Sequence, residues 1–144
     1  MGIGQLIGWG LTALIAFVLG GSWALDTRSA QSVRLEVNVT PSTVPADGVA
    51  QSRLTVRSLN ANGSSRAGDT IEVLAQGAGA FDRFRALTDQ RGQAVFVFIA
   101  ARGNKYRPTA PVPVIVTNSS LGTLVEVSKT ANVTINVVEP GKTP

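Results

Sequence analysis

The sequence predicts an all-β domain, an antiparallel sandwich of short strands, preceded by one transmembrane α-helix. Apolar and polar residues alternate in several short runs separated by turn residues, and the first 25 residues carry no charged side chain. A period of two is typical of strands with one buried face, and a long uncharged apolar run is typical of a membrane span. We expect an anchor over residues 1–25, a tether over 26–32, a sandwich over 33–139 and a C-terminal tail over 140–144.

The uncharged N-terminal run is long enough to cross a bilayer. At 1.5 Å per residue, residues 3–25 make roughly 34 Å of helix, against a hydrocarbon core of about 30 Å. A cleaved secretory signal is the competing interpretation, since Ser22-Trp23-Ala24 has the small-x-small pattern of a cleavage site. A signal peptide starts with a positively charged segment, but no Lys or Arg precedes this apolar run. The sequence therefore favours a retained, single-pass anchor.

Small residues mark one possible packing face on this anchor. Gly4 and Gly8 form a GxxxG pair, which lets a neighbouring helix approach closely, and Gln5 beside them is a candidate interhelical hydrogen-bond donor. Glycine is also common in membrane helices without such a role, so simple composition is the alternative explanation. We expect the helix to pack against other membrane-protein subunits through this face, with the lipid bilayer around the rest.

The strands are predicted from alternation. Valine and leucine in residues 33–39 alternate with Arg34, Glu36 and Asn38. The same period recurs in residues 53–57, 70–75 and 133–137, and proline, Asp-Gly and Asn-Gly turn signals separate the runs. No run in this region has a helical period.

Two further runs are almost continuously apolar and predict central strands. They cover residues 94–101 and 112–116. About seven short strands at this spacing are typical of an immunoglobulin-like antiparallel sandwich. The chain has no cysteine, so it is not an antibody-type domain with the usual bridge between its sheets.

Three segments in a fixed order resemble the bacterial Ig-like domain of the invasin and intimin type. They are Pro41-Ser42-Thr43-Val44-Pro45-Ala46-Asp47-Gly48, Asn62-Gly63 with Gly68, and Thr88-Asp89-Gln90-Arg91-Gly92-Gln93-Ala94. The last has the Thr-Asp-x-x-Gly-x-Ala pattern of a turn that leads into a buried strand. The resemblance covers most of the chain after Val33, here as a single copy on an anchor. It implies a sandwich fold and surface adhesion or ligand binding.

Turn chemistry gives the same interpretation of the last segment. The Asp89 carboxylate can accept hydrogen bonds from its own turn, and Gly92 can take a positive φ before the strand begins. Asp47 and Asp69 also stand beside glycine, so Asx turns explain them without a calcium ion.

Composition removes most catalytic chemistry. The chain has neither cysteine nor histidine, which excludes thiol nucleophiles, Ser-His-Asp triads and the common zinc sites. Paired carboxylates need a pocket, which a small sandwich with few aromatic residues seldom forms. We expect a protein that is not an enzyme and has no cofactor, metal or small-molecule substrate.

Positive charge is concentrated between Phe81 and Arg107. This segment holds six basic and two acidic residues, a net +4 that equals the net charge of the chain. It predicts a basic interaction patch for an acidic protein or anionic lipid, and an ordinary solvated sheet face is the alternative. Nucleic acid is not an expected partner, because Tyr106 is the only aromatic residue close to the cluster at 102–107. The predicted patch consists of Arg83, Arg85, Arg91, Arg102, Lys105 and Arg107.

These observations predict a structural or accessory subunit of a larger membrane complex. The helix would pack beside other spans, and the sandwich would cap their extracytoplasmic surface. The alternative is a surface adhesion or ligand-binding module of the invasin and intimin type. Arg28 and Arg34 follow the anchor and favour a cytoplasmic domain by the positive-inside rule. So few charges orient a helix weakly, and the extracytoplasmic character of the module leads us to expect a bacterial cell membrane with the β domain outside.

Overall fold

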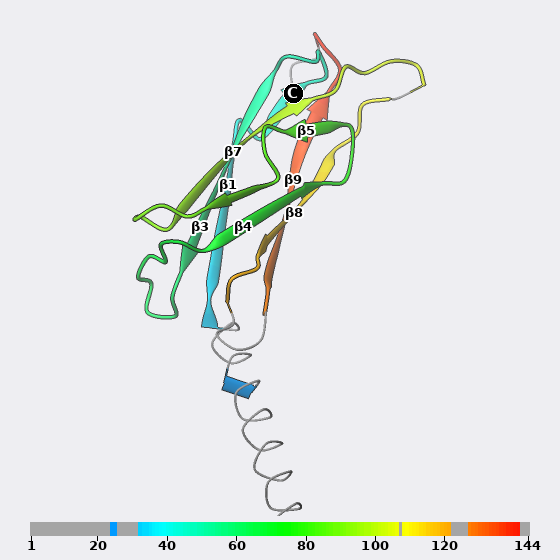
Figure 1. Ribbon diagram of the computed structural model, residues 1–144. Coiled ribbons are helices and arrows are strands. Elements are labelled where there is room, and N and C mark those ends of the chain that lie inside the picture. The colour runs from blue at the N-terminus through cyan, green and yellow to red at the C-terminus, as the bar shows by residue number, and fades with distance from the viewer. Residues whose placement is uncertain (1–23, 26–31, 107, 122–126, 142–144) are drawn as a thin grey trace, which may run out of the picture.

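The computed structural model describes residues 24–25, 32–106, 108–121 and 127–141, and these form a two-layer β-sandwich (Figure 1). The predicted anchor and tether lie outside the described residues except for Ala24, Leu25 and residue 32. No helix within the described ranges is long and apolar enough to cross a membrane. The anchor, and its packing residues Gly4, Gln5 and Gly8, therefore stay predictions.

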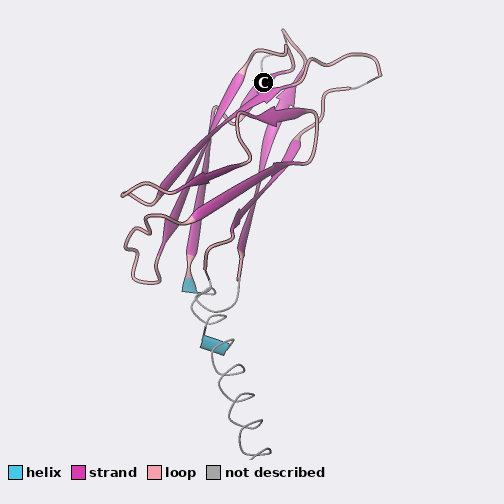
Figure 2. Ribbon diagram, viewed as in Figure 1, coloured by secondary structure: helices cyan, strands magenta, loops and turns pink. Residues whose placement is uncertain are grey.

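The described domain consists almost entirely of strands and loops (Figure 2). The four-stranded sheet has the order β1 (Arg34–Thr40), β3 (Gln51–Leu59), β7 (Gln93–Ala100), β5 (Gly79–Phe81). The five-stranded sheet has the order β2 (Thr43–Pro45), β9 (Lys129–Val138), β8 (Val112–Asn118), β4 (Thr70–Ala75), β6 (Arg85–Leu87).

The sandwich is antiparallel with one exception. After β1 the chain passes through a cis Thr40–Pro41 peptide into the other sheet, where β2 pairs in parallel with β9. β2 continues in the direction of β1, and β9 runs the same way, so this pair is parallel. The predicted antiparallel sandwich is therefore found in every strand pair of the described residues except this one.

The apolar runs predicted as central strands lie inside their sheets, β7 between β3 and β5 and β8 between β9 and β4. Three short strands, β2, β5 and β6, were not predicted. Pro45 and the glycines at 77 and 79 indicated turns where β2 and β5 lie. Proline has no backbone N–H to donate, but Pro45 is tolerated because β2 is an edge strand, and one side of an edge strand needs no hydrogen-bond donor. A Cβ at Gly79 would overlap the ring of Phe98, so glycine is what allows β5 to pair with β7.

The core lies between the sheets and is built from the inward residue of each alternating pair. The Phe81 ring packs edge-on against those of Phe96 and Phe98, with centroids 6.3 and 5.4 Å apart. Burying one such side chain contributes about 1.5–3 kcal/mol. The largest fully buried side chains are those of Phe96, Phe98, Leu54, Ile71 and Ile135.

We call the end of the sandwich where β1 begins the proximal pole and the opposite end, where β7 ends, the distal pole (Figure 1). At the proximal pole Val33 is only 3% exposed and packs with Leu121 and Val127 of the segment between β8 and β9. The chain therefore enters the domain through a small apolar cluster of its own.

Candidate binding surface

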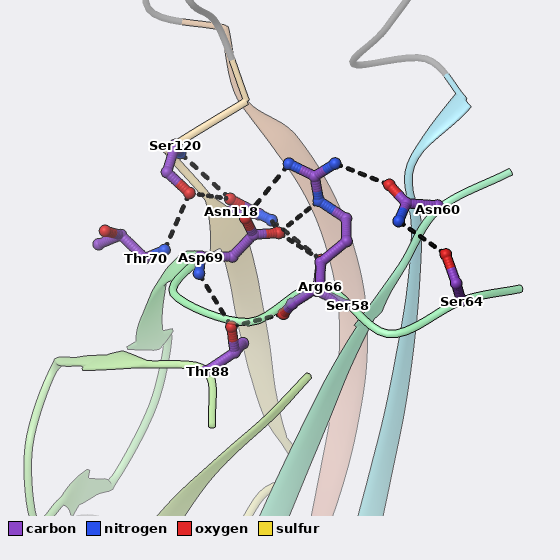
Figure 3. Close-up of polar contacts among 9 residues, drawn as sticks. All are labelled: Ser58, Asn60, Ser64, Arg66, Asp69, Thr70, Thr88, Asn118 and Ser120. Atoms are coloured by element: carbon purple, nitrogen blue, oxygen red, sulfur yellow. Dashed lines mark hydrogen bonds and ion pairs between the residues drawn. The ribbon is translucent and has the colours of Figure 1, made fainter. Parts of the chain in front are cut away.

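A buried polar network organises the proximal pole (Figure 3). The Asp69 side chain accepts hydrogen bonds from Ser58 Oγ at 2.7 Å, from Asn118 Nδ2 at 2.7 Å and from Arg66 Nε at 2.8 Å. Ser58 lies on β3 and Asn118 on β8, so one carboxylate joins the two sheets.

The network continues into the neighbouring loops. Arg66 Nη1 donates to Asn60 Oδ1 at 2.8 Å, and the Thr88 hydroxyl donates to the Arg66 carbonyl at 2.7 Å. The Ser120 hydroxyl donates to Asn118 Oδ1 at 3.0 Å. Every buried polar side-chain atom in the described part of the chain has a partner. The loops that precede β4, β7 and β9 are thus held to one another.

Two effects act on the pKa of Asp69. Burial alone raises it, but hydrogen bonds from Arg66, Ser58 and Asn118, with the positive charge of Arg66, outweigh burial and hold the pKa below its usual range. The carboxylate is already occupied by three donors, so its arrangement is that of a structural link. Within the described ranges, no group of His, Cys, Asp and Glu is placed to hold a metal ion.

The Thr88–Ala94 turn has the predicted structure. Asp89 Oδ1 accepts from the backbone N–H groups of Arg91 and Gln93 at 2.8 and 2.9 Å, and Gly92 has φ +71°. A Cβ at Gly92 would lie 2.7 Å from the Ser58 carbonyl oxygen, so the turn packs tightly against the network.

The other two aspartates differ from each other. Asp47 Oδ1 accepts from the N–H groups of Val49 and Ala50, as predicted for an Asx turn, and these bonds lower the pKa of Asp47. Asp69 is not a turn residue of this kind, since its carboxylate bonds to Ser58, Arg66 and Asn118. The predicted Asx turn at Asp69 was wrong, because the side chains of Ser58 and Asn118 come close to Asp69 only in the folded chain.

An apolar groove of about 210 Å³ lies along the side of the sandwich where the chain passes from β5 to β6. Its walls are residues 73–75 of β4 and 79–81 of β5, with Arg83 and Phe84 from the crossing segment. We call this the crossover groove. Leu74 and Phe84 are 59% and 71% exposed, so two large apolar side chains face solvent along it.

Ion pairs hold the two predicted patch residues near the crossover groove. Arg83 Nη2 lies 2.8 Å from Asp82 Oδ2, and Arg85 Nη2 lies 2.6 Å from Glu72 Oε1. The Arg85 guanidinium also lies 5.8 Å from the centre of the Phe84 ring. Both arginines therefore have local carboxylate partners, and Arg85 helps to orient Phe84.

Asp82 links this segment to the edge of β7. Its Oδ1 accepts from the Val97 N–H at 2.8 Å. Burial raises the pKa of Asp82, but the Val97 hydrogen bond and Arg83 outweigh this and lower it. The crossing segment is thus pinned to the four-stranded sheet while Phe84 stays exposed.

The other predicted patch residues lie elsewhere. Arg91 is in the turn before β7, and Arg102 and Lys105 follow its far end. Eight residues of strand separate these positions by about 26 Å. Arg107 lies outside the described residues. The structure places Arg83 in the wall of the crossover groove, with Arg85 next to Phe84 beside it, but puts Arg91 and Arg102 at opposite poles. The binding role of all six residues stays a prediction.

A broad depression of about 910 Å³ lies at the distal pole. Small residues of segments 77–80 and 99–102 line most of it, and Gly48 completes the lining. Arg102 is the one ionisable residue among those that line it, and its Nε donates to the Asp47 carbonyl at 3.3 Å. The lining offers a shape but no pair of groups suited to acid–base work.

The exposed apolar residues Leu74, Phe84 and Leu87 were not predicted from the sequence. Phe84 carried a usable signal, because an aromatic residue between Arg83 and Arg85 in a segment between core strands is poorly placed for burial. Leu74 had no sequence signal of its exposure. It continues an apolar strand, and whether its side chain is exposed depends on which strands lie beside β4.

Solved structures of intimin domains have a similar fold. The D00-D0 domain of intimin matches with a TM-score of 0.61 and 16% identity over 76% of this chain and 49% of that chain. The D0-D1 domain matches with a TM-score of 0.51 and 17% identity over 70% of this chain and 46% of that one.

A third structure is the C-terminal 282-residue fragment of intimin in complex with the intimin-binding domain of the translocated intimin receptor. It matches with a TM-score of 0.54 and 15% identity over 74% of this chain and 33% of that one. The chain thus spans half or less of each of these three intimin structures. No family model and no curated protein matches the sequence. On structural similarity, the described sandwich has the bacterial Ig-like fold of the intimin domains, as the sequence resemblance predicts.

Proposed function

We propose that the chain is a non-catalytic, membrane-anchored Ig-like module and an accessory subunit of a membrane protein complex on its extracytoplasmic side. In this proposal the sandwich binds a protein partner through the crossover groove, and the N-terminal helix packs beside the partner's spans. The observation that carries the proposal is the exposure of Leu74 and Phe84 along one apolar groove.

The composition of the groove supports protein binding. Single exposed apolar residues are ordinary, but an aromatic and an aliphatic side chain along one concavity, with arginines beside them, resemble the centre of a protein interface. Covering such a side chain contributes about 1.5–3 kcal/mol. The ion pairs of Arg83 and Arg85 hold the rim in place before binding, which lowers the ordering cost.

Reach supports a partner in the same membrane. The expected tether over residues 26–32 extends at most about 25 Å, and the nine residues of β3 span about 30 Å. If the anchor is retained, the tether and the domain together keep the crossover groove within about 55 Å of the bilayer. This favours a neighbouring membrane subunit over a distant ligand.

Three observations support a role without catalysis. The chain has no cysteine or histidine. The Asp69 carboxylate is occupied by three donors, and the distal depression has one ionisable lining residue, Arg102.

The second candidate is an adhesion module that binds a ligand outside the cell. It is favoured by the shared fold with intimin, one fragment of which was solved in complex with a receptor domain. The two candidates differ in where the partner resides, because an accessory subunit co-extracts with a protein of the same membrane and an adhesin does not.

Gentle detergent extraction of the full chain tests the proposal. We expect a membrane protein to co-purify with it, and L74S combined with F84S to abolish that association. Leu87→Ser is the matched control, since Leu87 is 66% exposed on the same edge of the sheet but does not line the groove. Extraction of the unaltered chain as a lone monomer would contradict the subunit proposal and favour adhesion.

A further inference from the structure

The outer face of the four-stranded sheet carries two arginines that the predicted patch omitted. Alternation along β3 turns Arg53 and Arg57 outward, about 13 Å apart. Neither arginine takes part in the ion pairs of the described residues. Arg57 lies opposite Glu36 in the register, but the Glu36 carboxylate is 3.4 Å from Arg34. Within the described part of the chain, two exposed guanidinium groups are thus left without a carboxylate partner.

An apolar stripe runs beside them on β7. The register places Arg53 opposite Val97 and Thr55 opposite Val95. Val95 and Ile99 are 40% and 37% exposed, although they belong to the almost continuously apolar run predicted as a central strand. We call Arg53, Arg57, Val95, Val97 and Ile99 the basic face.

The two outer faces of the sandwich differ in charge. The four-stranded sheet presents three arginines and one glutamate on β1 and β3. The five-stranded sheet presents Glu72 and Arg85, which pair with each other. The outward residues of β8 and β9 are uncharged. Among the described strands, arginines without an ion pair are therefore confined to one side.

We propose that the basic face is a second protein interface, which takes a partner surface that presents carboxylates around a small apolar centre. The proposal rests on the function proposed above, that the chain is a binding module, and names the partner chemistry of a surface other than the crossover groove. Guanidinium groups pair with carboxylates in a planar, two-bond geometry, and the β-branched stripe supplies apolar area between them.

Charge favours this occupant over a second copy of the chain. A second copy would bring like charges together on this face, which opposes self-association. Arginines beside an apolar stripe can also meet an anionic lipid surface, so the nanodisc measurement below decides between lipid and protein.

The test uses the full chain in detergent micelles and poly-L-glutamate as the acidic probe. R53Q combined with R57Q should lower the affinity for poly-L-glutamate roughly five- to tenfold at low salt. R83Q combined with R85Q is the matched control, because it removes the same charge from residues that already have partners, and it should change the affinity less than about twofold. Equal losses in both variants would overturn the proposal and leave only an effect of net charge.

Further outcomes exclude the other occupants. The chain has no cysteine, so V97C gives a single attachment site for a fluorescent probe. Quenching of that probe by headgroup-labelled lipid in phosphatidylglycerol nanodiscs, but not in phosphatidylcholine nanodiscs, would show a membrane-facing surface and overturn the proposal. Oxidative disulfide dimers of V97C would overturn it in favour of a second copy.

The same variants separate this inference from the proposed function. We expect poly-L-glutamate to weaken the association with the co-purifying membrane protein in the unaltered chain and not in R53Q with R57Q. If the partner is lost only from the L74S and F84S variant and poly-L-glutamate has no effect, this inference fails and the proposed function stands. If no partner co-purifies, the proposed function fails, while the affinity for the probe still decides the chemistry of the basic face.

Discussion

The Asp69 carboxylate lies 2.7 Å from the side-chain nitrogen of Asn118, although 49 residues separate the two along the chain. Asn118 ends β8, and its Oδ1 also accepts from Ser120. Leu121 follows and packs on Val33, where the chain enters the domain. One hydrogen bond therefore connects the loop before β4 with the start of the segment after β8, and this segment packs on Val33, where the chain enters the domain.

Removal of the Asn118 side chain should destabilise the sandwich. In Asn118→Ala the buried Asp69 carboxylate loses a donor, which costs about 1–3 kcal/mol. Urea unfolding followed by far-ultraviolet circular dichroism measures this. Asn136→Ala, on the exposed face of β9, should change the free energy of unfolding by less than about 0.5 kcal/mol. Equal effects of the two variants would mean that the Asp69 network does not stabilise the sandwich.

Acid should weaken the contribution of Asp69. The folded pKa lies below the ordinary value of 3.8, so below that value the unfolded state binds more protons than the folded state. The stabilisation is complete above pH 3.8 and is lost as the pH falls through the folded pKa. Unfolding curves of the unaltered chain and of Asp69→Asn should therefore differ most near pH 7 and converge in acid. A difference that stays constant with pH would contradict an ionised Asp69.

Gly92 should be intolerant of a side chain for two reasons. Its φ of +71° is unfavourable for other residues, and a Cβ would meet the Ser58 carbonyl oxygen at 2.7 Å. Gly63 has φ +82°, but a Cβ there would meet no atom within 4 Å, so Gly63 isolates the backbone effect. Thermal unfolding should show a larger loss for Gly92→Ala than for Gly63→Ala, which should cost about 1 kcal/mol. Equal losses would mean that the close approach is relieved without cost.

Bulk on the predicted anchor face should weaken assembly without unfolding the sandwich. Gly4→Ile with Gly8→Ile adds volume only within the predicted span, where close packing drives helix association. Co-purification should fall while the strand content measured by circular dichroism is unchanged. Alanine at both positions is the control, since it keeps the face small. If co-purification is unchanged with isoleucine at both positions, Gly4 and Gly8 have no packing role and reflect only the usual composition of membrane helices.

Local patterns predicted the parts of the fold that depend on neighbours in sequence. The interior positions of β7 and β8 follow from their apolar runs, and the Asp89 turn follows from residues within five positions. Strand β5 was not predictable, because its pairing depends on a close approach between Gly79 and Phe98.

The candidate surfaces were less predictable because they combine distant segments. Charge counted along the sequence grouped Arg83 with Arg91 and Arg102, whereas the strands place these residues far apart. Arg53 and Arg57 were recognised only as the polar half of an alternating strand. Their lack of carboxylate partners among the described residues depends on which side chains the neighbouring strands β1 and β7 place beside them.

The proposal that the crossover groove binds a protein of the same membrane is tested most directly by site-specific photo-crosslinking in intact membranes. A photoreactive residue at position 84 faces the crossover groove, and one at position 132 is exposed on β9, outside the groove lining. We expect one dominant adduct with an integral membrane protein from position 84 and none from position 132. Equal adducts from the two positions, or no adduct with a protein of the same membrane, would contradict it.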